Sequence, residues 1–318
     1  MHAWLPLVAM CSLVLLFAYG TKKDLTNAND ISLPDNFINS IFYYPFDYQY
    51  FLDNVFGITV AHLRADKNVI NPDSYTEIIN FNFDDILNCF AIMSSNDTMS
   101  MKDFIIGSNG EQWKLIKRVI QEDGEYWTST FKNSSLTYKY VMGAIYQGGY
   151  SLYVIGLHNI LKKMETLANY IQSILPDQKY RVGINLYLTP QGENQAFEVH
   201  MDYMDGLILQ VAGCKKWRIY DPKSYPEDLQ GIIPTKDNMI KPDQKQMNLM
   251  TFAEYELRKG DVLYIPKGTL HEAATNCTLD RKEETNISNE KNKTREPSVH
   301  LTIGIEDTSL MQSQRFDL

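Results

Sequence analysis

Short apolar stretches alternate with polar turns through the second half of the chain. Seven of these stretches are rich in β-branched and aromatic residues, and Gly, Pro or polar residues separate them. In chain order they read VGINLYL, AFEVHMD, LILQVAG, KWRIYDP, GDVLYIP, LHEAAT and SVHLTIGI. Closely spaced short strands of this kind predict a β-sandwich or barrel.

Three further segments complete the pattern. Residues 157–175, LHNILKKMETLANYIQSIL, place apolar residues at helical spacing, and Pro176 follows them, so we expect one long helix that packs on the core. Residues 21–150 mix aromatic and apolar runs and predict an α/β region without a chemical signature. Residues 276–297 are polar and highly charged, which predicts a mobile loop.

Composition narrows the class of protein. The chain has 318 residues, of which 44% are apolar and 22% charged, and this is ordinary for a globular protein. Its net charge of −9 argues against nucleic acid as a main partner, because phosphate binding needs a basic surface.

The first residues resemble a secretory leader. An apolar run from Leu5 to Tyr19 is short for a membrane span, and Ala18 and Gly20 are the small residues that signal peptidase prefers. We therefore expect a signal peptide over residues 1–20 and no membrane span after cleavage. No Lys or Arg precedes the run, so an uncleaved anchor is the alternative.

Other features agree with entry into the secretory pathway. Glycosylation triplets occur at five asparagines: Asn96, Asn133, Asn276, Asn286 and Asn292. The chain ends in RFDL (residues 315–318), which has the order of an endoplasmic reticulum retrieval signal but departs from it at two positions. Cys89, Cys214 and Cys277 would remain after leader cleavage, so at most one disulfide is expected.

The strongest chemical signal is the spacing of His200 and Asp202. Residues two apart on a strand point to the same face, so an imidazole and a carboxylate can reach one divalent metal. The alternative is the polar face of a surface strand. His271, which opens a distant strand, would supply a third ligand, and two histidines with one carboxylate are typical of non-haem Fe(II) oxygenases.

Together these motifs resemble a known family. NLYLTP, HMD, LILQVAGCKKW, GDVLYIPKGTLHEA and SVHLTI follow one another as in the JmjC-type 2-oxoglutarate oxygenases of the cupin superfamily, ribosomal oxygenase branch. The resemblance covers residues 180–305. It implies a mainly β fold with helical decoration: a double-stranded β-helix over residues 153–318, preceded by an N-terminal α/β region over residues 21–152.

The resemblance also implies roles for individual residues. His200, Asp202 and His271 would bind Fe(II), and Lys215 would pair with the distal carboxylate of 2-oxoglutarate. Residues matching other positions of the cosubstrate pocket are Asn185, Tyr187 and Ser298. His300 is expected to be a packed core histidine, and His62 and His158 fall in no motif. Around the metal pair, the family's usual Pro, Tyr and Asp are replaced by Val199, Met201 and Tyr203, which alters the surface that faces the substrate.

The implied activity is hydroxylation of a protein side chain with O2 as cosubstrate, in the endoplasmic reticulum lumen or outside the cell. A nuclear histone lysine demethylase or ribosomal-protein histidyl hydroxylase is the first alternative, and it conflicts with the leader and the triplets. A non-catalytic cupin binding module is the second. The chain ends soon after the last predicted strand, so we expect no dimerisation or winged-helix domain and no ribosomal substrate. The sequence leaves the substrate and the oligomeric state open.

Overall fold

The computed structural model describes residues 41–42, 47–65, 113–121, 124–130, 138–159, 161–235, 240–277 and 296–309. All of them fall within one compact unit, residues 33–318. Several predictions concern residues outside these ranges: the leader, Cys89, the triplets at Asn96, Asn133, Asn286 and Asn292, most of the polar loop, and residues 315–318.

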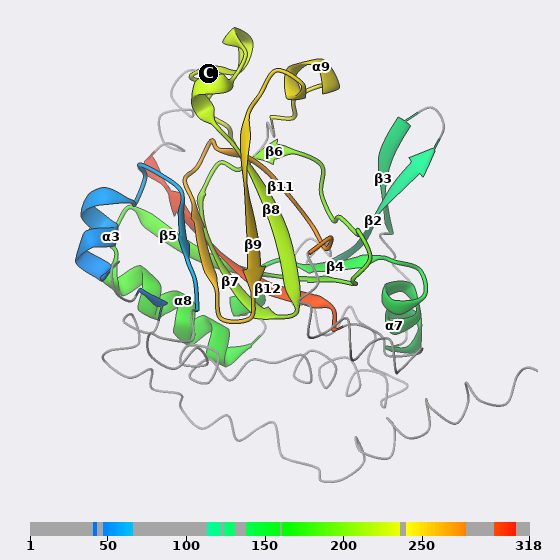
Figure 1. The fold of residues 1–318 in the computed structure, drawn as a ribbon. Coiled ribbons are helices and arrows are strands. Elements are labelled where there is room, and N and C mark those ends of the chain that lie inside the picture. Colours follow the sequence, from blue (N-terminus) through cyan, green and yellow to red (C-terminus); the bar gives the residue numbers. More distant parts are fainter. Residues whose placement is uncertain are drawn as a thin grey trace, which may run out of the picture. The chain divides into compact units, whose positions relative to one another are not determined.

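The described strands form two antiparallel sheets (Figure 1). The larger sheet has the order β1 (Ala61–Leu63), β10 (Val262–Ile265), β7 (Asp205–Ala212), β12 (Ser298–Asp307), β5 (Tyr180–Thr189), β4 (Ser151–Val154), β2 (Trp113–Gln121) and β3 (Gly124–Thr130). The smaller sheet has the order β6 (His200–Met201), β11 (Leu270–Ala274), β8 (Cys214–Tyr220) and β9 (Phe252–Arg258). This arrangement confirms the predicted jelly-roll fold with helical decoration.

At β7, β10 and β12 the larger sheet buries both of its faces, and alternation along the strands separates them. On β7, Leu207 and Leu209 belong to the main apolar core, whereas Ile208 packs with Trp217 in a separate cluster between the sheets. Helices α3 (Tyr48–Asn54) and α8 (Lys162–Ile174) pack on the main core, and α7 (Tyr138–Tyr146) contributes to it further along the sheet. One face is therefore covered by helices and the other faces the smaller sheet.

The face toward the smaller sheet carries most of the polar side chains of these strands. In β5 and β12 the core-facing residues are apolar, for example Leu186 and Leu301. The alternating positions carry Thr189, Ser298 and His300, all fully or almost fully buried. Buried polar groups are costly unless they have partners, so a polar barrel interior indicates a site for a polar ligand rather than a packed core.

The predicted long helix is divided in two. A short 3₁₀ turn, Leu157–Asn159, precedes α8, which begins at Lys162 and ends at Ile174, just before Pro176. The turn follows Gly156, whose φ of 66° is left-handed, and the Nδ1 atom of His158 accepts a hydrogen bond of 3.0 Å from the Ile184 N–H. His158 thus ties the turn to β5, and our placement of this residue within the helix was wrong.

All seven predicted strands are present, although one is shorter than expected. Strand β9, in the same half of the chain, was not predicted. AFEVHMD forms a strand only at His200–Met201, because the chain bends at residues 196, 197 and 199. Strand β9 was missed because most of its side chains are exposed or half-buried, so no apolar alternation marks it. The predicted boundary between residues 152 and 153 falls inside β4, which pairs with β5 of the barrel.

The connection from β8 to β9 holds three short helical elements: Pro222–Ser224, Glu227–Leu229 and α9 (Gln244–Met247). Over the part of the chain that the structure describes, we find no helix with the length and apolarity to cross a membrane.

Candidate metal and cosubstrate site

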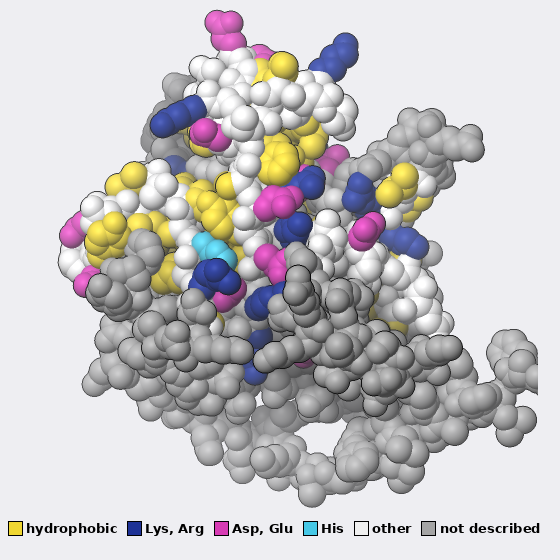
Figure 2. Space-filling model, in the orientation of Figure 1, with side chains coloured by type: hydrophobic (Ala, Val, Ile, Leu, Met, Phe, Trp, Pro, Cys, Tyr) yellow, Lys and Arg dark blue, Asp and Glu magenta, His cyan; other side chains and the backbone are white. Residues whose placement is uncertain are grey.

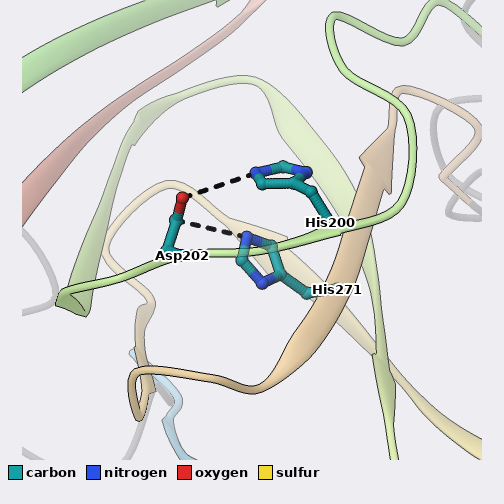
Figure 3. Close-up of side chains that lie close together, drawn as sticks. All are labelled: His200, Asp202 and His271. Carbon is teal, nitrogen blue, oxygen red and sulfur yellow. Dashed lines mark ion pairs between the residues drawn. The ribbon is translucent and has the colours of Figure 1, made fainter. Parts of the chain in front are cut away.

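Strand pairing brings the three predicted metal ligands together. His200 on β6 lies directly opposite His271 on β11, and Asp202 follows His200 by two residues. Asp202 Oδ1 lies 3.7 Å from His200 Nε2, and Asp202 Oδ2 lies 3.6 Å from His271 Nε2 (Figure 3). All three ligand atoms fall within 4.8 Å of one another. One cation could therefore contact all three.

Backbone carbonyls set the tautomer of both histidines. The Nδ1–H of His200 donates to the carbonyl of Glu198 at 2.7 Å, and the Nδ1–H of His271 donates to that of Thr269 at 2.9 Å. A carbonyl can only accept, so the proton of each neutral ring is on Nδ1 and the lone pair is on Nε2. Both lone pairs are thereby available to a metal.

The surroundings keep the ligands ready to bind a cation. Burial, together with the charge that His200 would carry, lowers the pKa of His271, so this ring is neutral at physiological pH. The side chain of His271 is only 7% exposed, whereas that of Asp202 is 35% exposed. The site is therefore closed on the His271 side and open on the Asp202 side.

A second cluster of possible ligands is occupied by a covalent bond. Cys214, Glu256 and Cys277 also lie within ligating distance of one another, but Cys214 and Cys277 form a disulfide. Over the described ranges the histidine–aspartate cluster is therefore the candidate metal site. The disulfide also agrees with the expectation of at most one.

Lys215 is buried in the barrel interior. It is 2% exposed, and its Nζ donates to the Thr189 hydroxyl at 3.2 Å and lies 5.9 Å from the ring centre of Tyr187. Burial lowers its pKa to about 7. Among the residues that the structure describes, no carboxylate pairs with Lys215, so the ammonium is suited to an anion that enters the barrel.

One cavity connects the metal ligands to this lysine. Its lining includes all three ligands together with Tyr187, Lys215, Trp217, His300 and Thr302. Asn185 and Ser298 are not part of this lining. The Asn185 side-chain oxygen accepts from the Gly156 N–H, and the Ser298 hydroxyl accepts from Gln210. Their roles in cosubstrate binding stay predictions.

Three residues of this cavity region were not identified from the sequence: Thr189, Trp217 and His300. Trp217 follows Lys215 by two positions on β8, and His300 follows Ser298 by two on β12. Strand alternation places Trp217 on the face of Lys215 and His300 on the face of Ser298, but it does not say which distant strands lie opposite those faces. His300 is packed and buried as expected, and its ring also lines the cavity.

Three residues beside His200 and Asp202 replace the ones usual in the family, and they differ in their surroundings. Val199 and Met201 are buried in an apolar cluster with Leu270, away from the cavity. Tyr203 is half-buried, and burial and the nearby Glu306 carboxylate raise its pKa to about 12. The neutral phenol of Tyr203 stands next to Asp202 in sequence, on the more open side of the site.

The outer surface near the smaller sheet carries charges of both signs. Arg218 on β8 bonds Glu254 on β9 at 3.0 Å, and Lys216 reaches the same carboxylate at 3.2 Å. On the face shown in Figure 2, Lys and Arg side chains lie among Asp and Glu side chains across the described surface. Such a mixture gives no single-sign field on this face.

Comparison with known proteins agrees with this geometry. Residues 158–282 match the family model described as JmjC domain. This segment is a JmjC domain. Two curated relatives, both named bifunctional lysine-specific demethylase and histidyl-hydroxylase NO66, come from Caenorhabditis elegans (40% identical over 98 residues) and Drosophila erecta (34% over 125 residues). The matches cover 31% and 39% of this chain but only 12% and 16% of those relatives.

Solved structures of YcfD from Escherichia coli are also similar. One shares 15% identity, covers 84% of this chain and 54% of that chain, and has a TM-score of 0.48. Another is described as a ribosomal oxygenase in complex with cobalt and 2-oxoglutarate, and it has a TM-score of 0.44 with 15% identity. It covers 82% of this chain and 52% of that chain.

Proposed function

We propose that this JmjC-domain protein is an Fe(II)- and 2-oxoglutarate-dependent oxygenase that hydroxylates a protein side chain. One observation carries the proposal: a single cavity has His200, Asp202 and His271 at one end and the buried Lys215 in its wall. The names of the curated relatives support the same class of reaction.

The residues present fit both groups. Two imidazoles with lone pairs on Nε2 and one carboxylate form the donor set that binds Fe(II) and leaves further coordination positions open. Lys215 provides a compact positive charge in a position where its burial is costly without an anion. A dicarboxylate that spans from the metal to this lysine satisfies both ends of the cavity.

The protein's own groups bind, orient and exclude water. When bound, iron and 2-oxoglutarate together supply O2 activation, with loss of CO2 to give succinate and insertion of oxygen into a C–H bond. His200 and His271 hold the metal, and their backbone hydrogen bonds keep both rings from turning. Trp217 and Ile208 supply an apolar wall, and the more exposed Asp202 marks the side on which a substrate side chain enters.

Metal and cosubstrate binding test this proposal. Under anaerobic conditions, Fe(II) plus 2-oxoglutarate should give the visible charge-transfer band of an iron-chelated keto acid. His200→Ala, Asp202→Ala and His271→Ala should each abolish the band. If all three variants bind iron as the wild type does, the metal assignment is wrong.

Lys215→Ala separates the cosubstrate site from the metal site. We expect it to weaken 2-oxoglutarate binding about tenfold to a hundredfold, because a charge-assisted hydrogen bond contributes roughly 1.5–3 kcal/mol. Fe(II) affinity should be unchanged. Lys216→Ala is the matched control, because Lys216 points outward to Glu254. Equal affinities in the two variants would contradict the assignment of Lys215.

For location we propose the lumen of the endoplasmic reticulum. The Cys214–Cys277 disulfide supports an oxidising compartment, because disulfides are rare in the cytosol and nucleus. Asn276, which begins a glycosylation triplet, is exposed and therefore accessible to modification. The leader-like N-terminus and the other triplets support the same location.

The nuclear alternative draws on the names of the relatives, which are a lysine demethylase and histidyl hydroxylase. Incubating the Fe(II)-loaded protein with methylated histone peptides, and separately with extracts of secretory proteins, distinguishes the substrates by mass spectrometry. A non-catalytic module would convert no 2-oxoglutarate to succinate with either. The intact ligand set and Lys215 favour turnover.

A further inference from the structure

Three rings stack across neighbouring strands on the inner face of the larger sheet. Tyr153 on β4 lies opposite Tyr187 on β5, and Tyr187 lies opposite His300 on β12. Both pairs have ring centres 4.6 Å apart, and the planes of Tyr187 and His300 differ by only 4°. Trp217 closes the other side, edge-on to His300 at 5.4 Å. The plane of the His300 ring is therefore fixed by its neighbours.

An irregularity in β7 lies beside this ring. The pairing of β12 with β7 shifts between Val299 and His300, which skips one residue of β7. The Gln210 amide nitrogen donates to the Ala212 carbonyl at 2.8 Å and to the Ser298 hydroxyl at 2.9 Å, which ties the bulge to β12. Bulges near active sites redirect side chains, and this one adjoins the residue that enters the cavity.

His300 itself has unused hydrogen-bonding capacity. It is 1% exposed, and its buried Nδ1 has no hydrogen-bond partner among the described residues. The Nδ1 atoms of His158, His200 and His271 all have partners. A buried polar atom without a partner is costly, so its retention in a cavity wall indicates a ligand that meets it.

The ring is neutral at physiological pH. Burial and the neighbouring charge of Lys215 hold the pKa of His300 well below its usual range. The other titratable groups around it are Tyr187, whose pKa burial raises well above the usual range, and His271 across the cavity. A neutral imidazole has one N–H to donate and adds no second charge to the one on Lys215.

We propose that His300 is a positioning residue for the cosubstrate, and that its ring N–H donates a hydrogen bond to the carboxylate that Lys215 neutralises. This inference rests on the proposed function, because it assigns the cosubstrate end of the same cavity. One ammonium and a neutral donor match a carboxylate with a single negative charge. The stack on Tyr187 fixes the direction of the N–H before the ligand arrives, so little ordering is needed on binding.

Direct binding tests the role of His300 apart from turnover. Calorimetric titration of the full-length, Zn(II)-loaded protein with 2-oxoglutarate gives the affinity without reaction. His300→Phe keeps a flat ring on Tyr187 but loses the N–H, and should weaken binding about tenfold to a hundredfold with Zn(II) affinity unchanged. His300→Asn, which restores a short N–H donor, should recover part of the loss.

His62→Phe is the matched control. His62 is also a largely buried histidine edge-on to a tyrosine, but it contacts Asp261 and Tyr255 and is not part of the cavity lining. This variant should bind 2-oxoglutarate as the wild type does. In protein labelled with ¹⁵N-histidine, 2-oxoglutarate should move the His300 ring signals to the pattern of one hydrogen-bonded neutral tautomer.

The outcomes separate the two proposals. If the wild type binds Zn(II) but not 2-oxoglutarate, the proposed function fails. If the wild type binds 2-oxoglutarate and His300→Phe binds it equally well, only the role of His300 is overturned. If His300→Phe does not fold, two other results together would overturn the role of His300. The His300→Asn variant would bind 2-oxoglutarate as tightly as the wild type, and the His300 ring signals of the wild type would not move when 2-oxoglutarate binds.

Discussion

Burial decides which groups in the cavity carry charge. His271 and His300 are neutral because burial lowers the pKa of each ring. Backbone carbonyls orient the rings of His200 and His271, and stacking orients that of His300. Lys215 is the exception, because its ammonium lies deep in the barrel, away from water, with no counter-charge among the described residues. The cosubstrate site is thus maintained at a cost to the stability of the ligand-free protein.

This cost should be visible as a pH-dependent stability. Because burial lowers the pKa of Lys215 to about 7, the folded protein releases a proton there that the unfolded chain keeps until about pH 10.4. The contribution of Lys215 to the free energy of unfolding therefore rises with pH between these values. Lys215→Met removes the penalty, so the metal-free variant should be more stable than the wild type near about pH 6, with a smaller difference near about pH 9.

Urea unfolding at the two pH values measures the difference. Lys216→Met is the control, since Lys216 is paired with Glu254 at the surface and should show no comparable pH-dependent gain. A Lys215→Met variant that is less stable than the wild type at the lower pH would mean that the ammonium is not penalised by burial.

At the residue scale, the sequence was sufficient where spacing and chemistry coincide. The two-residue spacing of His200 and Asp202 predicted that both side chains reach one metal, and the structure brings them together with His271. Strand β6 nevertheless ends at Met201, and Asp202 follows it outside the strand. Thr189 and His300 could not be assigned in this way. Their role depends on which distant strand lies opposite, and neither residue type by itself indicates a ligand.

At the element scale, the turn between β7 of the larger sheet and β8 of the smaller sheet positions Lys215. Gly213 joins the two strands with φ of 61°, and Lys215 follows two residues later. A Cβ on Gly213 would overlap the carbonyl oxygen of Pro297, which lies just before β12. The turn therefore needs glycine both for its conformation and for the close approach of β12.

Gly213→Ala should destabilise the protein more than a left-handed backbone alone requires. The strained conformation costs roughly 1–2 kcal/mol, and the overlap with backbone should add about 1–3 kcal/mol. Gly231→Ala is the matched control, because Gly231 has φ of 71° but nothing within 4 Å of the added methyl. Chemical denaturation compares the two, and equal losses of stability would show that Pro297 moves aside freely.

The elements that could be predicted were those with a buried face. Strands such as β7 and β12 are marked by apolar residues because both sheet faces are covered. Strand β9 lies at the edge of the smaller sheet with exposed side chains such as Phe252, so its sequence has no such mark. The break before α8 was also hidden, since it depends on the contact of His158 with β5.

At the scale of the whole molecule, the compartment determines which substrates this site can meet. The disulfide joins the start of β8, beside Lys215, to the residue that follows Asn276 after β11. Closing a loop between cysteines 63 residues apart should contribute about 2–4 kcal/mol to stability. In a reducing compartment the same bond would be open, and the fold would lose this contribution.

We therefore predict that the protein from expressing cells is glycosylated and has the Cys214–Cys277 bond closed. A glycosidase specific for high-mannose glycans should increase its gel mobility, and Asn276→Gln should remove one glycan because Asn276 is exposed. Thiol labelling should leave Cys214 and Cys277 unlabelled before reduction and should label both after reduction. Deleting residues 315–318 should release the chain to the medium if RFDL acts as a retrieval signal. A chain that carries no glycan and has both thiols free would contradict the luminal location. The nuclear alternative would then be favoured.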